Sequence, residues 1–115
     1  MAKRIAIILR YSPLNSIRGP EGFRLGVGMT LEGNNVDLIL MGQGAWSALP
    51  LQSSKVGRPD ANQFIDSLEL CGITAYVDFE EIPVSLQSKL RKEFVKKEKS
   101  ELFQLISRAD VVISF

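Results

Sequence analysis

The stretch VDLILM, residues 36–41, is an apolar run interrupted by a single charge at Asp37. Three other runs share its character: RIAIIL (Arg4–Leu9), ITAYVD (Ile73–Asp78) and VVISF (Val111–Phe115). All are nearly continuous in apolar residues and lack the polar alternation of a strand with one wet face. This pattern is typical of strands that are covered on both faces, as in a parallel sheet between helices.

Helical patterns fill the gaps between these runs. Apolar or small residues recur at helical spacing over residues 61–71, and Gly72 follows as a C-terminal stop. A second pattern covers residues 102–109, with Ser100 as its expected N-cap. A third covers residues 82–94, where apolar side chains lie four apart. Each spacing predicts a helix that packs one face against the sheet.

This alternation predicts one α/β domain over residues 1–115. Its expected fold is a three-layer α/β/α sandwich with a mostly parallel sheet of four to five strands. The stretch Leu49–Asp60 is rich in Ser, Gly and Pro and is typical of a loop. If there is an additional strand, Ser54–Gly57 is the expected place.

Composition excludes several classes of function. The net charge is +1, from 14 basic and 13 acidic residues, so there is no strong overall field for nucleic acid or an anionic membrane. The absence of histidine removes Ser-His-Asp and Cys-His pairs and histidine metal ligands. With one cysteine, a thiolate zinc site is excluded too. We therefore predict no metal and no cofactor.

Two segments, one near each end of the chain, give expectations about the protein's location in the cell and its binding partners. The apolar part of MAKRIAIILRYSP is short and no cleavage site follows, so we interpret it as a strand and not as a signal peptide. A single cysteine suits a reducing compartment, and we expect a cytoplasmic protein without a membrane span. The basic cluster Lys89–Lys99 is either a solvated helix face or a docking patch.

The first helix, predicted over about residues 19–32, contains several glycines and is apolar nearly all round. Such a helix is usually buried on more than one side, here either by another subunit or within the chain. We expect an oligomer, because a chain of this size has difficulty covering so much apolar surface. The interface candidates are Gly22, Gly26, Trp46 and Phe115.

Ligands of open α/β sheets bind beyond the carboxyl ends of the strands. The residues there that could hold a small molecule or an anion are Arg10, Ser12, Arg18, Gln43 and Asp78. The Gly42–Gly44 turn partly resembles a phosphate-binding turn, but it lacks the third glycine of that motif and is also compatible with a plain turn. Asp78 either caps a helix or faces water, or it faces a groove and pairs with Arg10 or Arg18. Cys71 continues the apolar stripe of its helix, which predicts packing in the core.

Longer segments of the chain resemble the DsrE/DsrF-like family, which includes the Tus and Dsr sulfur-relay subunits. The resemblance is carried by LRYSP, by SIRGPEGFRLGVGMTLEGNNVDLILMGQGAW, by LELCGITAYVD and by SRADVVISF. Its most specific part is the glycine-spaced helix followed by the stretch Gly33–Trp46. Only about residues 49–60 and 80–99 lie outside it.

The resemblance implies a small cytoplasmic α/β protein that forms homo- or hetero-oligomers with like subunits. Certain members carry a persulfide on a cysteine just after the third strand and pass this sulfur to a partner protein. In this chain Asp78 occupies the matching position, and a carboxylate cannot hold a persulfide. We therefore expect a non-catalytic accessory or docking subunit in sulfur transfer, with a sulfur-carrier protein as a possible partner.

Two alternatives to this role stay open. The chain could be a small-molecule or anion-binding α/β domain that uses the strand-end residues named above. It could also be an enzyme in which Asp78 or Glu80 acts as acid or base, with help from a second subunit.

Overall fold

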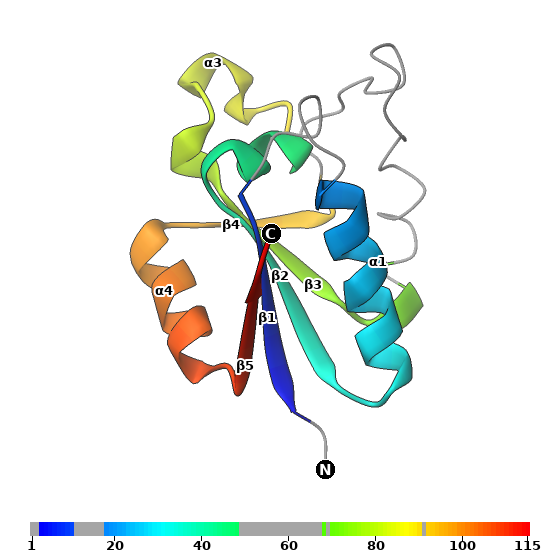
Figure 1. Cartoon of the computed structure of the whole chain (residues 1–115). Helices are drawn as coiled ribbons and strands as arrows, with labels where there is room; N and C mark the ends of the chain where they lie inside the picture. The colour runs from blue at the N-terminus through cyan, green and yellow to red at the C-terminus, as the bar shows by residue number, and fades with distance from the viewer. Residues whose placement is uncertain (1–2, 11–17, 49–67, 69, 91) are drawn as a thin grey trace.

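The structure is a computed structural model that describes residues 3–10, 18–48, 68, 70–90 and 92–115. Its centre is a five-stranded sheet in the order β4-β3-β2-β1-β5, in which every neighbouring pair of strands is parallel (Figure 1). The strands are β1 (Arg4–Leu9), β2 (Asn35–Leu40), β3 (Thr74–Asp78), β4 (Phe94–Lys97) and β5 (Val111–Ser114). Four of them agree with the predicted strands to within a residue at either end.

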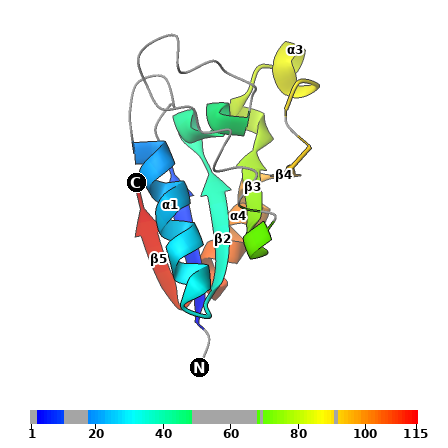
Figure 2. The ribbon, with the colours of Figure 1, turned by 90° about the vertical axis from the view of Figure 1, so that its right-hand side faces the viewer.

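Helices cover the sheet on both faces. Helix α1 (Arg18–Leu31) lies across one face and α4 (Lys99–Arg108) lies across the other, as Figures 1 and 2 show from two directions. Side chains alternate accordingly along β1: Ile5, Ile7 and Leu9 join the core on the α1 side, and Ala6 joins the cluster under α4. The predicted three-layer α/β/α sandwich is confirmed.

Glycine ends the first helix for a conformational reason. Gly33 has a φ of 87°, a left-handed value that side chains disfavour. This turn lets the amide of Gly33 donate to the Thr30 carbonyl at 3.0 Å and the amide of Asn34 donate to the Met29 carbonyl at 3.3 Å. These two bonds satisfy carbonyls that the helix would otherwise leave free, and they direct the chain into β2.

The helix predicted over residues 61–71 lies largely outside the described residues. Its last turn is described, because Leu68, Leu70 and Cys71 are helical. Gly72 follows with a φ of 73°, and the Ile73 amide donates to the Leu68 carbonyl at 2.9 Å. Gly72 therefore ends the helix as the sequence predicted.

The predicted helix over residues 82–94 is wrong. A short 3-10 helix η3 (Phe79–Glu81) precedes this region, which contains one turn of helix α3 (Val84–Gln87) and then the start of strand β4. Ile82, Leu90 and Phe94 are all buried on the α1 side, but each belongs to a different local structure. Apolar residues spaced four apart thus reflect three separate contacts with the core and not one helix face.

The fifth strand is therefore β4, at the edge of the sheet, and the basic cluster Lys89–Lys99 follows a turn and this edge strand instead of a helix face. The alternative strand at Ser54–Gly57 and the surrounding loop lie outside the described residues. Helix α4 begins at Lys99 after Glu98. The predicted N-cap Ser100 is thus inside the first turn.

A 3-10 helix η1 (Gly42–Ala48) follows β2 and packs on the carboxyl end of β1. Gly42 has a φ of 55°, and a Cβ on Gly44 would collide with the carbonyl oxygen of Leu9. Backbone conformation and close packing explain both glycines. The structure therefore favours a plain turn here over a phosphate-binding one.

Candidate functional site

All five parallel strands have their carboxyl ends at the same end of the sheet. There, backbone hydrogen bonds join the ends of β1 and β5. The amide of Arg10 donates to the Phe115 carbonyl at 3.0 Å, and the Phe115 amide donates to the Ile8 carbonyl at 2.8 Å. The side chain of Arg10 is left exposed, as is that of Gln43 in η1. These two candidates thus lie beyond the carboxyl ends of their strands, as predicted.

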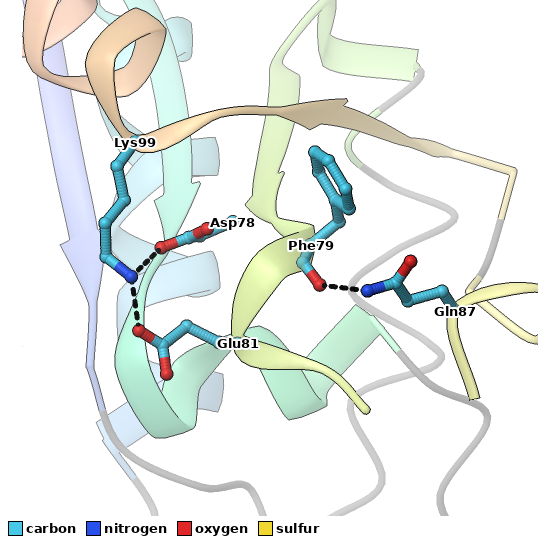
Figure 3. A network of polar contacts seen from close by, with 5 residues as sticks. All are labelled: Asp78, Phe79, Glu81, Gln87 and Lys99. Atoms are coloured by element: carbon cyan, nitrogen blue, oxygen red, sulfur yellow. Dashed lines mark hydrogen bonds and ion pairs between the residues drawn. The ribbon is translucent and has the colours of Figure 1, made fainter. Parts of the chain in front are cut away.

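Asp78 ends β3 and is fully buried, at 0% exposure. The Nζ atom of Lys99 lies 3.1 Å from its Oδ2 atom and 2.7 Å from Oε1 of Glu81 (Figure 3). Neither carboxylate oxygen of Asp78 accepts a well-formed hydrogen bond from the described residues. The ammonium group of Lys99 is therefore the main compensation for burying this carboxylate.

Lys99 is fixed in its charged form by these neighbours. Contact with the carboxylate of Glu81, and second with that of Asp78, raises the pKa of Lys99 well above its usual range. A lysine that keeps its proton cannot act as a nucleophile or as a base near neutral pH. The cluster of Asp78, Glu81 and Lys99 is therefore suited to joining the end of β3 to the start of α4.

The turn that presents Glu81 is held from its other side. The side-chain amide of Gln87 donates to the Phe79 carbonyl at 3.2 Å, a contact drawn in Figure 3, and to the Ile82 carbonyl at 3.0 Å. The Phe79 carbonyl also accepts from the backbone amide of Ile82 at 3.1 Å, so Gln87 adds a second donor there and supplies a donor to the Ile82 carbonyl. The position of Glu81 against Lys99 follows from this bracing.

Of the two predicted partners of Asp78, Arg10 is wrong and Arg18 stays a prediction. The ion pair of Asp78 is with Lys99, whereas Arg10 is exposed and makes no ion pair with a described residue. Ser12 and the side chain of Arg18 lie outside what the structure describes. Asp78 also does not face water, because η3 and the start of α4 enclose it.

Sequence reasoning missed Lys99 as a functional partner. It lies in a stretch with many lysines, and no local pattern separates it from its neighbours. Glu81 belongs to the acidic stretch after β3 that the sequence places at the strand ends, but its contact with a lysine from α4 is a tertiary feature. Glu80, the other candidate acid, is exposed.

The interface candidates differ in how far their own chain covers them. Gly26 is buried against its own sheet, where an added Cβ would contact Ile7, Val36 and Ile73 at 3.5–3.8 Å. Within this chain it is therefore covered by the sheet and not free for a second subunit. Trp46 and Phe115 are half-buried and pack on the same core. Gly22 lies in α1, and its surroundings are outside the described side chains.

Cys71 packs against the core on the α1 side, but it is half-buried and not sealed as the sequence predicted. Its position at the end of a helix leaves one side of the residue uncovered. Cys71 comes before β3, whereas Asp78 is the last residue of that strand. The thiol and the carboxylate thus belong to opposite ends of the strand.

Comparison with solved structures identifies a close match in fold. The chain is similar to the ychN protein of E. coli, with a TM-score of 0.81, 20% sequence identity and full coverage of both chains. This likeness extends over the whole chain, and at 20% identity it concerns the fold alone. A scan against protein-family models found no match, and a comparison with curated proteins found none either.

Membrane spans and metal sites can be assessed for the residues that the structure describes. In that part of the chain, none of the helices has the length and apolar character needed to cross a membrane. No group of three or more Cys, Asp or Glu side chains among those residues is arranged to hold a metal ion.

Proposed function

We propose that this chain is a DsrE/DsrF-like subunit of a sulfur-transfer system and that it does not carry the sulfur itself. The sequence resemblance supplies the link to sulfur transfer, and the likeness in fold over the full chain is consistent with it. On this proposal the protein acts as an accessory or docking subunit, in a reducing compartment such as the cytoplasm.

The observation that carries the proposal is the state of Asp78. It occupies the position of the sulfur-carrying cysteine in the resembled family, and it is buried and paired with Lys99. A persulfide needs a thiol sulfur, and a carboxylate has none. Here the position is used to bind α4 to the sheet, which is a structural role.

A mass-shift experiment tests this proposal. The purified protein is incubated with a cysteine desulfurase and cysteine, and intact mass is measured under non-reducing conditions. We expect no added sulfur. The matched variant Asp78→Cys places a thiol beside Lys99 at a position with 0% exposure, so we expect little added sulfur there unless the end of β3 opens to the donor.

The half-buried thiol provides the decisive control. Cys71→Ser removes the only native cysteine, so any sulfur bound by the native protein must disappear in this variant. A mass gain on Cys71 in the native chain would show that the protein carries sulfur after all, by a different residue from the one in its relatives.

We also propose that the subunit associates with like subunits. Several large apolar side chains are exposed in the described surface, among them Leu31 at 79%, Phe103 at 56% and Val112 at 46%. Burial of such side chains favours association. Light scattering at micromolar concentration is expected to give a mass above that of one chain, and a monomer would contradict this part of the proposal.

A further inference from the structure

A polar groove lies beside α4, on the opposite face of the sheet from α1. It has a volume of about 180 Å³, and the residues that line it are Tyr76, Lys97, Glu101, Gln104, Leu105 and Arg108. The four residues from α4 are spaced i, i+3, i+4 and i+7, so they form one stripe along the helix. Tyr76 and Lys97 come from β3 and β4.

The charges in and around this groove leave a surplus of one positive side chain. Lys97 is paired with Glu101 at 3.3 Å. Burial raises the pKa of Asp37, on the neighbouring strand β2, and the positive charge of Arg4 lowers it by a smaller amount. Arg108 makes no ion pair or side-chain hydrogen bond with any described residue. The guanidinium of Arg108 is thus available to an external anion.

Tyr76 provides a neutral donor in the same groove. Burial, and second the charge of Asp37, raise the pKa of Tyr76 above its usual value, against smaller lowering effects of Lys97, Arg4 and Thr74. The phenol therefore keeps its proton near neutral pH and can donate a hydrogen bond. Its ring and Leu105 supply apolar surface between the polar ends of the groove.

We infer that this groove binds a small organic anion, with its carboxylate or phosphate group held by Arg108 and Tyr76. Arginine offers a planar pair of donors that matches either group, and such charge-assisted bonds are the strong ones. The body of the ligand lies against Leu105 and the ring of Tyr76. This inference does not rest on the proposed role in sulfur transfer, and the groove is separate from the strand-end residues discussed above.

Titration followed by backbone amide NMR tests the inference, with benzoate, its neutral isostere benzamide, and inorganic phosphate as probes. We expect saturable shifts at Tyr76, Leu105 and Arg108 with benzoate, with phosphate, or with both. Benzoate alone indicates a carboxylate site, phosphate alone a phosphate site, and both an anion site of broad selectivity. Benzamide should bind at least about ten-fold more weakly than benzoate, because the charge is lost.

Two variants and one control distinguish binding by specific side chains from a general attraction to positive charge. Arg108→Gln should weaken binding of the responding anion by about ten-fold or more, and Tyr76→Phe by a smaller factor. Lys96→Gln also removes one exposed cation, but Lys96 pairs in register with Val77, whose side chain packs on the α1 side. Binding to Lys96→Gln should remain unchanged.

Three results would overturn the inference. One is the absence of saturable shifts in the groove with either anion. Another is equal binding of benzoate and benzamide without a response to phosphate. The last is equal weakening by Arg108→Gln and Lys96→Gln. Should Arg108→Gln fail to fold, the response of Tyr76→Phe compared with Lys96→Gln decides the matter.

Discussion

The two faces of the sheet are built very differently. Among the described residues, fifteen buried apolar side chains form the core on the α1 side and only three, Ala6, Ile39 and Leu102, form the cluster under α4. Five strands at about 4.8 Å spacing make a sheet roughly 20 Å wide. A helix is about 10 Å across, so α4, the helix that the described residues place on this face, spans about half of its width.

This difference shows where the molecule keeps surface for other molecules. On the α4 face, Val95 of β4 and Val112 of β5 are 40% and 46% exposed, on either side of the helix. The polar groove lies in the uncovered part near β3 and β4. The α1 side contributes most of the described core, whereas the α4 side has the candidate ligand groove and two partly exposed valines.

The largest effect is expected from Leu102→Ala. Leu102 is fully buried and is the only residue of α4 that is, so the helix depends on it for contact with the sheet. We expect a loss of about 2–5 kcal/mol in the free energy of unfolding, measured by urea denaturation. The neighbouring Phe103→Ala, at a position 56% exposed, should lose much less. Equal losses would show that α4 is held in another way.

The next largest effect is expected from Lys99→Met, which leaves the buried carboxylate of Asp78 without its partner. Unfolding by urea should show a clear loss of stability, which Asp78→Asn in the same chain should largely restore. Because the pKa of Lys99 is raised, its contribution is full below the usual lysine pKa of about 10.4 and is lost as pH rises beyond it.

Lys97→Met is the matched control for Lys99→Met. It breaks the exposed pair with Glu101, and such pairs contribute about 0–1 kcal/mol. A loss as large as that of Lys99→Met would contradict the distinction between a lysine that compensates the buried carboxylate of Asp78 and one that pairs with the exposed Glu101.

On the α1 side, Gly26→Ala should stabilise the protein by about 0.5–1 kcal/mol. Alanine is the better helix former, and the new Cβ would make only ordinary contacts, the nearest at 3.5 Å from Ile7. The shift can be measured by thermal denaturation. Gly33→Ala, at a φ of 87°, should be destabilising instead. A destabilised Gly26→Ala would mean that this helix packs more tightly than its contacts indicate.

The smallest effect is expected from Asp37→Asn. Burial raises the pKa of Asp37, so its charged form is disfavoured in the folded protein. At pH 7 the variant should be more stable by about half a kcal/mol or less, given solvent screening. The gain should vanish below the usual aspartate pKa of about 3.9, where both side chains are neutral. A gain that persists at low pH would exclude this electrostatic origin.

Much of the fold could be predicted because its signals are local. β1, β2, β3 and β5 appear as apolar runs, and the stops at Gly33 and Gly72 follow from the conformation that a helix end requires. β4 could not be predicted, since FVKK has a polar half and only Phe94 is buried. An edge strand needs little apolar character, so its sequence resembles a loop or a helix face.

The candidate site was predictable only in part. The carboxyl edge was identified by the rule for open α/β sheets, and Asp78, Arg10 and Gln43 are found there. The pairing of Asp78 with Lys99 was not, because the fold brings Lys99 to Asp78 through a turn, a short helix and an edge strand. The groove beside α4 was missed for the same reason.

The sequence by itself determined that this is a parallel α/β sandwich, because strands covered on both faces must be apolar at nearly every position. It also placed an acid, Asp78, at the end of the third apolar run. Only the tertiary structure decided that this acid is buried against Lys99 and that Arg108 and Tyr76 line the same groove. Those features depend on distances between segments far apart in the chain, which no local pattern of residues encodes.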